Sequence, residues 1–404
     1  MSLLSNCVLI NNQGVGGRCH GAPRQVACPA NRVFERCSRQ IERKTVLPYF
    51  FMYMIPAIAA VGGDNGGRKI KVGGDRSDAL IRMFAIVLII MAGFRFQVGG
   101  DWTNYINYFN KAAYIDIDEA IYFGMEPGYY LSNKLGAYLE IGVIAPNLIA
   151  AALFFGGLAR FCSHMQRPWL AMAVSIPYLS VVVAMGYSRQ AAALGLIMYG
   201  YQALSVGRLK LFVGLVFAAA AFHKTAVLVL PIAILASSRG RWWSALWLGV
   251  VVFVGYRVSL SSSIDSMVTS YVDGEMQSSG ALIRLIMNAI PALIFVIFRK
   301  KFDLNTTEER LWFWIALISL AILAALLVRP SMSTALDRVA LYFLPIQVLV
   351  FSKMPNVLDR AGRSSAQMVT ASILIYYCAV LAVWLNYAAN AYLWLPYQIN
   401  FSAS

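Results

Sequence analysis

The chain has 404 residues, of which 59% are hydrophobic and only 13% are charged, and its mean hydropathy is +0.62. Soluble domains carry about 25% charged residues, so this composition excludes a set of soluble domains and predicts an all-α, polytopic integral membrane helix bundle. The formal net charge of +15 could suit nucleic acid, but the basic residues lie between apolar segments, where they are typical of cytoplasmic loops. We therefore expect no nucleic-acid partner.

Residues 1–45 form a basic, polar N-terminal tail that differs from the rest of the chain. The tail holds Cys7, Cys19, Cys28 and Cys37, whose wide spacing contains no C-x-x-C pair and argues against a zinc or redox site. It also lacks the apolar stretch of a signal peptide. We expect this tail to be disordered and dispensable for activity.

Apolar segments follow the tail in close succession. They cover 46–61, 80–98, 135–158, 169–185, 189–206, 209–222, 225–238, 244–258, 282–298, 311–328, 339–352 and 368–388. Several are shorter than the roughly 20 residues that a straight helix needs to cross a bilayer. We predict about 12 transmembrane segments, some short or broken, in one domain over 46–388, and a short outward-facing C-terminal tail over 389–404.

Loop charges orient these segments. The stretches "SVGRLK", "SRGRWW" and "FRKKF" are rich in Lys and Arg, and the positive-inside rule places such loops in the cytoplasm. The opposite, outer face then has two substantial loops, at about 99–134 and 259–281.

The stretch 209–236 admits two interpretations. It could be one long helix with His223 and Lys224 at its centre, or two short helices with "FHKT" at the turn on the outer face. Only the two-helix version fits the charge pattern downstream, so we predict it.

Basic residues border or enter apolar segments on the predicted outer face: Arg95, Arg189, Lys224, Arg329 and Arg338. A charged side chain at the bilayer centre costs about 2.5–3.5 kcal/mol on insertion scales. Snorkelling towards the headgroups explains any one of them, but it does not explain why each lies in a polar cluster. The alternative is an anion site, because the forked guanidinium matches phosphate oxygens.

Aromatic and acidic residues accompany these cations. Trp102 and a run of tyrosines could stack on sugar rings, although an interfacial aromatic belt explains each one equally well. A glycosyl transfer needs a base that takes the proton of the acceptor hydroxyl. The candidates on this face are Asp101, Glu126, His223 and Asp337, and a salt bridge to a neighbouring arginine is the alternative for each carboxylate.

Five blocks occur in a fixed order: "GFRFQVGGDWTNYINYF", "EPGYYLSNKL", "YSRQAAALGLIMYGYQAL", "GRLKLFVGLVFAAAAFHKTAVLVLPIAIL" and "LDRVALYFLP". In this order they resemble the EpsG-like family of exopolysaccharide and O-antigen (Wzy-type) polymerases, over roughly residues 46–388. The resemblance implies a GT-C-like membrane fold in the bacterial inner membrane and a metal-independent glycosyltransferase without cofactor. Such an enzyme moves a growing glycan from undecaprenyl diphosphate onto the next lipid-linked repeat unit at the outer face.

The resemblance also marks the expected site. The catalytic candidates are Asp101, His223 and Glu126. The substrate-binding candidates are Arg95, Tyr105, Arg189, Gln190, Lys224 and Arg338. The implied partners are the undecaprenyl-diphosphate-linked oligosaccharide, membrane lipid, and a flippase and chain-length regulator of the same pathway.

Other function classes remain open. A lipid-linked oligosaccharide flippase would also have many spans and buried arginines, but internal repeats and charges along a central path would be expected, and neither is evident. A membrane acyltransferase would need a histidine-centred site. A non-catalytic partner in polysaccharide assembly fits the composition equally well.

Overall fold

The computed structural model describes residues 46–62, 75–236, 249, 280–360 and 365–401. Regular structure in these ranges is helical, apart from an isolated bridge between Arg95 and Ile399, so the predicted all-α fold class is confirmed. The N-terminal tail, the apolar segment 244–258 and almost all of the predicted loop 259–281 lie outside the described residues.

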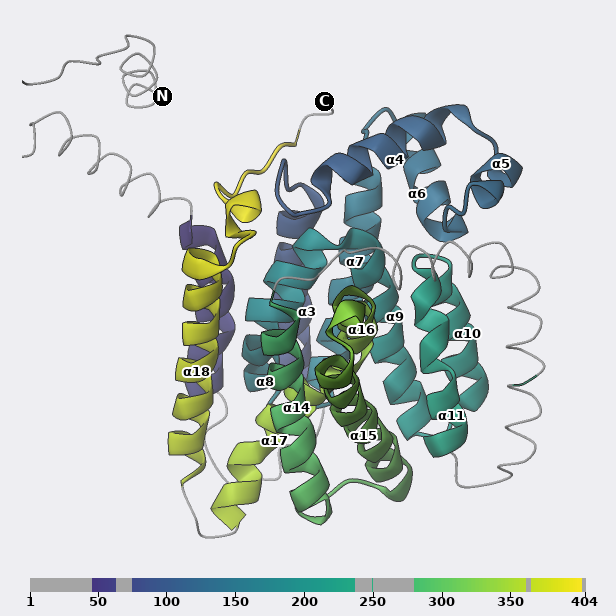
Figure 1. Cartoon of the computed structure of the whole chain (residues 1–404). Coiled ribbons are helices and arrows are strands. Elements are labelled where there is room, and N and C mark those ends of the chain that lie inside the picture. Colours follow the sequence, from purple (N-terminus) through teal and green to yellow (C-terminus); the bar gives the residue numbers. More distant parts are fainter. Residues whose placement is uncertain (1–45, 63–74, 237–248, 250–279, 361–364, 402–404) are drawn as a thin grey trace, which may run out of the picture.

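The helices pack into one bundle (Figure 1). In chain order the described helices are Val46–Gly62, α3 Asp75–Gly93, α4 Trp102–Tyr114, α5 Ile117–Tyr122, α6 Pro127–Tyr138, α7 Ile144–Ser163, α8 Pro168–Ser175, the π-helix η1 Ile176–Ala184, α9 Ser188–Ser205, α10 Leu209–Ala220, η2 Lys224–Val229, α11 Pro231–Ala236, α14 Ala281–Phe298, η5 Arg299–Lys301, α15 Thr306–Val328, η6 Pro330–Met332, α16 Ser333–Ala340, η7 Leu341–Phe343, α17 Pro345–Arg360, α18 Ala366–Tyr387 and η8 Ala391–Trp394.

The chain is a multi-pass membrane protein. Among the described residues four helices are long and apolar enough to cross a membrane: α7, α14 with η5, α15 and α18. A fifth is added if Pro330–Phe343 and Pro345–Asp359, which meet at an angle of 46°, form one broken span. The predicted count of about 12 is not confirmed, because the other described helices are too short or insufficiently apolar to pass the same test.

The centre of the bundle is built on α7 and α9, which lie side by side with α3 and α10 against them. Gly157 of α7 meets Gly195 of α9 so closely that a Cβ atom on Gly157 would overlap the Gly195 carbonyl oxygen. Membrane helices gain little from the hydrophobic effect against lipid, and close van der Waals packing through small residues stabilises them instead. This close approach fixes the position of α9, whose first turn carries Arg189 and Gln190.

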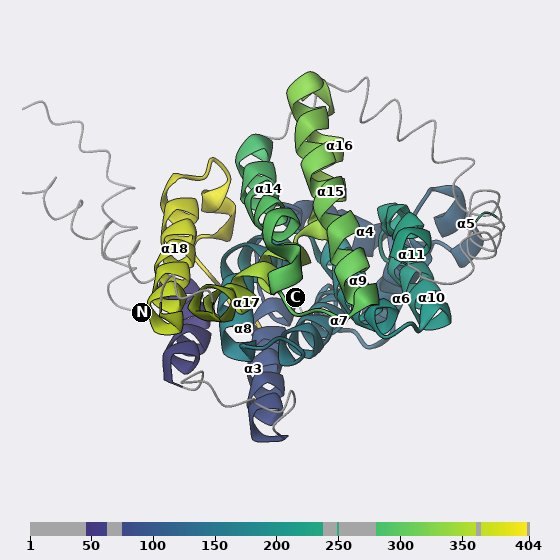
Figure 2. The ribbon, with the colours of Figure 1, turned by 90° about the horizontal axis from the view of Figure 1, so that it is seen from below.

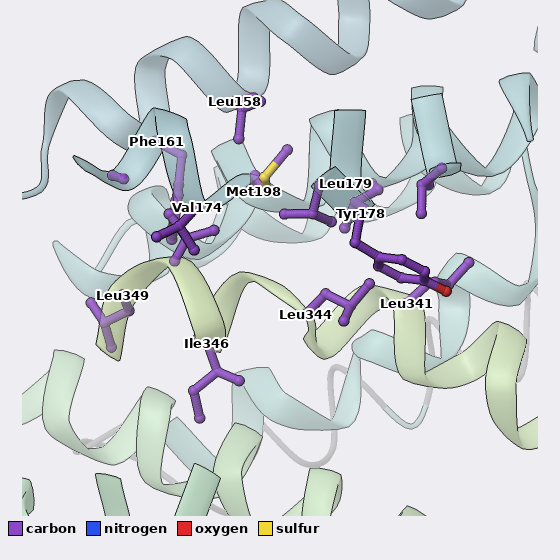
Figure 3. Close-up of a cluster of buried hydrophobic side chains, with 14 of the residues drawn as sticks. Leu158, Phe161, Val174, Tyr178, Leu179, Met198, Leu341, Leu344, Ile346 and Leu349 are labelled. Carbon is purple, nitrogen blue, oxygen red and sulfur yellow. The ribbon is translucent and has the colours of Figure 1, made fainter. Parts of the chain in front are cut away.

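A buried apolar cluster joins this centre to the C-terminal half (Figure 3). Its labelled members come from α7, α8, η1, α9 and the η7–α17 segment: Leu158, Phe161, Val174, Tyr178, Leu179, Met198, Leu341, Leu344, Ile346 and Leu349. Seen from below, α18 lies at one edge of the bundle and the α10–α11 pair at the other, with α7, α8 and α9 between them (Figure 2). The two halves of the chain therefore share one core.

The two-helix interpretation of residues 209–236 is confirmed. Helix α10 and the η2–α11 pair run side by side, and the turn between them holds His223, immediately before η2 begins at Lys224 (Figure 1). The turn lies at the end of the bundle where α6 begins, since the Gly128 amide donates a hydrogen bond of 2.8 Å to the Ala221 carbonyl.

The predicted outer loop 99–134 is itself largely helical. It forms α4, α5 and the start of α6, which lie across one end of the bundle (Figure 1). Helix α4 packs against α6, and α6 packs against α7. Residues of this segment therefore contact the first turn of α9, at Arg189.

Candidate functional site

Glu126 is placed by the Glu-Pro-Gly sequence at the start of α6. It is the N-cap residue, with extended backbone (φ −71°, ψ 125°), and Pro127 occupies the first turn, where its missing N–H costs nothing. The Glu126 side chain makes no capping hydrogen bond and is only 4% exposed. The carboxylate is therefore buried and directed to partners outside its own helix.

Arg189, in the first turn of α9, is one of these partners. Its Nη1 lies 3.0 Å from Glu126 Oε2 and donates a second hydrogen bond of 3.0 Å to the Tyr108 hydroxyl. The guanidinium lies 4.6 Å from the centre of the Tyr108 ring and 5.8 Å from that of Tyr129. Its side chain keeps 19% exposure, so Arg189 is held on two sides and remains partly accessible.

His223, at the turn after α10, is the other partner of Glu126. Its Nδ1 lies 3.4 Å from Glu126 Oε1, and among the described residues neither ring nitrogen has a hydrogen-bond partner. The ring is 6% exposed. A buried imidazole without hydrogen bonds is unusual, because buried polar groups are normally paired, and it leaves a nitrogen free to act on a bound molecule.

The charges of this pair follow from their surroundings. Burial alone would raise the pKa of Glu126, but the contact with His223 and the charge of Arg189 outweigh it and hold that pKa below its usual range. Burial lowers the pKa of His223 even though Glu126 opposes the effect. Near pH 7 the carboxylate is therefore charged and the imidazole is neutral.

Arg95, just beyond α3, is 2% exposed and reaches the first turn of α9 next to Arg189. It donates hydrogen bonds to the carbonyls of Ala92 and Val98, to Asn147 Oδ1 at 3.0 Å and to Ser188 Oγ at 2.6 Å. These bonds use four of the five donors that a guanidinium has. In the structure Arg95 therefore ties α3, α7 and the start of α9 together.

The C-terminal segment pairs with the stretch that carries Arg95. Residues 389–401, predicted as an outward tail, fold back along 94–99, with hydrogen bonds from the Phe96 amide to Gln398 and from the Gly99 amide to Leu393, each of 2.9 Å. Gly99 has a φ of +111° and lies so close to the Met185 carbonyl that a side chain would not fit. Arg95 is thereby locked between η1 and the end of the chain.

Tyr105 belongs to the buried aromatic wall of the site rather than to its surface. The side chain is 2% exposed, and its ring centre lies 5.8 Å from that of Tyr129. The Tyr129 hydroxyl is buried and has no hydrogen-bond partner in the described part of the chain. Tyr105 on α4 thus packs against Tyr129 on α6, whose ring in turn faces Arg189.

Gln190 connects the site to the C-terminal half. Its amide nitrogen donates a 2.8 Å hydrogen bond to the carbonyl of Arg338 on α16. The preceding residue, Asp337, forms a bidentate salt bridge with Arg284 of α14: Nε donates to Oδ1 at 2.9 Å and Nη2 donates to Oδ2 at 2.6 Å. The structure therefore brings Gln190 and Arg338 together and engages Asp337 in a salt bridge.

The remaining predicted residues lie at the edge. Asp101, at the start of α4, accepts a long hydrogen bond of 3.4 Å from Asn104, and within the described ranges no ion pair joins it to Arg95 or Arg189. Lys224 is half-buried next to His223. Arg329, beyond the end of α15, is exposed.

Two residues of this end were not predicted as part of the site. Arg284 lies three residues inside an apolar helix that follows a loop, which is the same signal that marked the other arginines. Trp394 is buried, and its indole donates a 2.9 Å hydrogen bond to the Val181 carbonyl in η1; no local pattern marks it, because only the folded chain brings it there.

Together these residues form a buried carboxylate–imidazole–guanidinium group at one end of a membrane bundle. It offers a neutral nitrogen as proton acceptor, a guanidinium with residual exposure as anion ligand, and aromatic faces beside the guanidinium. In the described ranges no group of three or more His, Cys, Asp or Glu side chains is placed to hold a metal ion.

No curated protein and no solved structure matches the chain. The EpsG family does match, over residues 78–399. This range begins after the first helix and includes every residue of the group described above. Since the match covers most of the 404 residues, the chain belongs to the EpsG family.

Proposed function

We propose that the protein is a polysaccharide polymerase of exopolysaccharide biosynthesis, acting on undecaprenyl-diphosphate-linked oligosaccharides at the outer face of the inner membrane. Family membership supports the pathway, and the apolar helices support a membrane-embedded substrate. The observation that carries the proposal is the Glu126–Arg189–His223 group, because it combines a base and an anion ligand in one enclosed place.

In the proposed reaction a hydroxyl at the non-reducing end of the acceptor repeat attacks the anomeric carbon that links the donor glycan to its diphosphate. The new carbon–oxygen bond forms as the bond from the anomeric carbon to the phosphate oxygen breaks. The hydroxyl proton passes to His223, and undecaprenyl diphosphate leaves with the electron pair of the broken bond.

Each residue of the group has a proposed task. The negative charge of Glu126, 3.4 Å from Nδ1 of His223, favours a proton on that nitrogen and leaves Nε2 as the proton acceptor, and Glu126 fixes Arg189 at the same time. Arg189 stabilises the charge that develops on the leaving diphosphate, with Lys224 and Arg338 as further cations at the rim. Arg95 acts indirectly by holding the first turn of α9, and Asp101 lies near the entry of the acceptor.

Deletion of the gene tests this proposal against a flippase. Lipid-linked glycan is extracted from the deletion strain and separated on a gel. A polymerase predicts that the ladder of long chains disappears while single repeat units still reach the outer face. Loss of all outward material, single units included, would instead assign the protein to transport.

A further inference from the structure

A cavity with polar and apolar walls lies at the opposite end of the bundle from Glu126. Its volume is about 360 Å³, and it lies between the end of α7, the end of α9, the start of α10 and the start of α15 (lower end in Figure 1). Helix α9 has 18 residues and is therefore about 27 Å long, so this cavity is roughly a membrane thickness away from the first turn of α9. Loop charge places this end in the cytoplasm.

Two arginines line the cavity with unused donors. Arg160, on the last turn of α7, lies 4.7 Å from the centre of the Tyr199 ring. Arg208 precedes α10 and is exposed. Within the described part of the chain neither guanidinium donates a hydrogen bond. Two unpaired guanidiniums on one cavity match the oxygens of a phosphate group.

An unpaired acceptor lies in the same wall. The amide nitrogen of Gln202 donates to the Arg160 carbonyl at 2.8 Å, whereas its Oε1 is buried and has no hydrogen-bond partner. A buried acceptor without a partner costs free energy, and a hydroxyl of a bound molecule would relieve it. The ligand therefore needs both a phosphate and a free hydroxyl group.

The acidic residue of the cavity has a structural task. We give Glu308 no role in binding, because it belongs to the cap of α15: its backbone amide donates a 2.9 Å hydrogen bond to Asn305 Oδ1, and its carboxylate accepts a long one of 3.5 Å from Asn305 Nδ2. Trp312 and Phe161 supply an apolar wall for the rest of the ligand.

We propose that this cavity binds a hydroxyl-bearing phosphate ester from the cytoplasmic side, with Arg160 and Arg208 holding the phosphate and Gln202 accepting from the hydroxyl. Such an ester could be the glycerol headgroup of an anionic lipid or a free sugar or glycerol phosphate. The site is separate from the Glu126 group and does not depend on the proposed polymerase reaction.

Binding to the purified full-length protein in detergent tests the proposal. Native mass spectrometry measures retained phosphatidylglycerol against phosphatidylcholine, which has the phosphate but lacks free hydroxyls, and glycerol 1-phosphate is titrated separately. We expect Arg208→Gln and the double change Arg160→Gln/Arg208→Gln to weaken binding at least about tenfold. Lys210→Gln is the matched control, because Lys210 is exposed nearby but does not line the cavity.

The outcomes separate the two sources of ligand. Arginine-dependent binding of phosphatidylglycerol but not of glycerol 1-phosphate assigns a lipid headgroup, and arginine-dependent binding of both assigns the free ester. Equal binding of phosphatidylcholine, or binding that Arg208→Gln and Lys210→Gln change equally, would overturn the proposal. Within the described ranges the exposed Arg208 side chain makes no hydrogen bond, ion pair or ring contact, so we expect its single substitution to leave the fold intact.

Discussion

His223 has the protonation state that a general base requires near pH 7. Its pKa is lowered by burial, so the imidazole stays neutral, and the rate should fall only as the pH falls through that lowered value, below about 6.5. The carboxylate of Glu126 has a lowered pKa and adds no further loss until more acidic pH. We expect His223→Gln to slow polymerisation by about 10²–10⁴-fold and to abolish this acid limb, measured with lipid-linked repeat units in proteoliposomes. A variant that keeps the wild-type pH profile would exclude His223 as the base.

A lysine in place of Arg189 and a lysine in place of Arg95 should have different effects, because the two arginines make different interactions. Arg189→Lys retains a positive charge beside Glu126 but loses the forked donors of the guanidinium. We therefore expect normal protein levels and a polymerisation rate that is lower by a factor of tens to thousands. Arg95→Lys cannot reproduce four buried hydrogen bonds and should destabilise the fold by about 3 kcal/mol. Membrane protein level and ladder formation are measured together, with Arg329→Lys as the exposed control. Equal levels for both variants would refute the structural role of Arg95.

At the scale of elements, the contact of α7 with α9 offers a test with neighbouring residues. Gly157→Ala places a methyl group on the Gly195 carbonyl, whereas Gly156→Ala meets nothing within 4 Å. We expect Gly157→Ala to cost about 1–3 kcal/mol and to lower activity, because α9 carries Arg189. Gly156→Ala should be neutral or slightly stabilising, because alanine favours helix. Thermal unfolding in detergent compares them, and equal melting temperatures would show that the helices are not in close contact.

What the sequence predicts well at this scale is the existence of helices, and what it misses is their long-range pairing. The apolar segments and the turn at "FHKT" follow from local hydrophobicity and charge. The return of residues 389–401 to Arg95 does not, since it depends on Gly99 and Trp394 meeting partners hundreds of residues away. The pairing of Arg284 with Asp337 is also hidden, because it joins two helices that are 53 residues apart in the chain. Among the described residues fewer helices than the predicted 12 pass as spans, because apolar runs such as 209–222 form helices too short to cross alone.

For the whole molecule, both proposed sites depend on which end of the bundle faces the cytoplasm. Asn110, on α4, is exposed at the end that holds Glu126, and Asn305 is exposed at the end that holds the cavity lined by Arg160 and Arg208. Loop charge predicts that Asn110 faces outward and Asn305 inward. Single-cysteine variants at these positions, in a background without the native cysteines, are treated with an impermeant thiol reagent in intact cells. We expect labelling at position 110, and at 305 only after the membrane is opened. The reverse pattern would place the Glu126 group in the cytoplasm, where repeat units on the outer leaflet could not reach it. That result would contradict the proposed polymerase function.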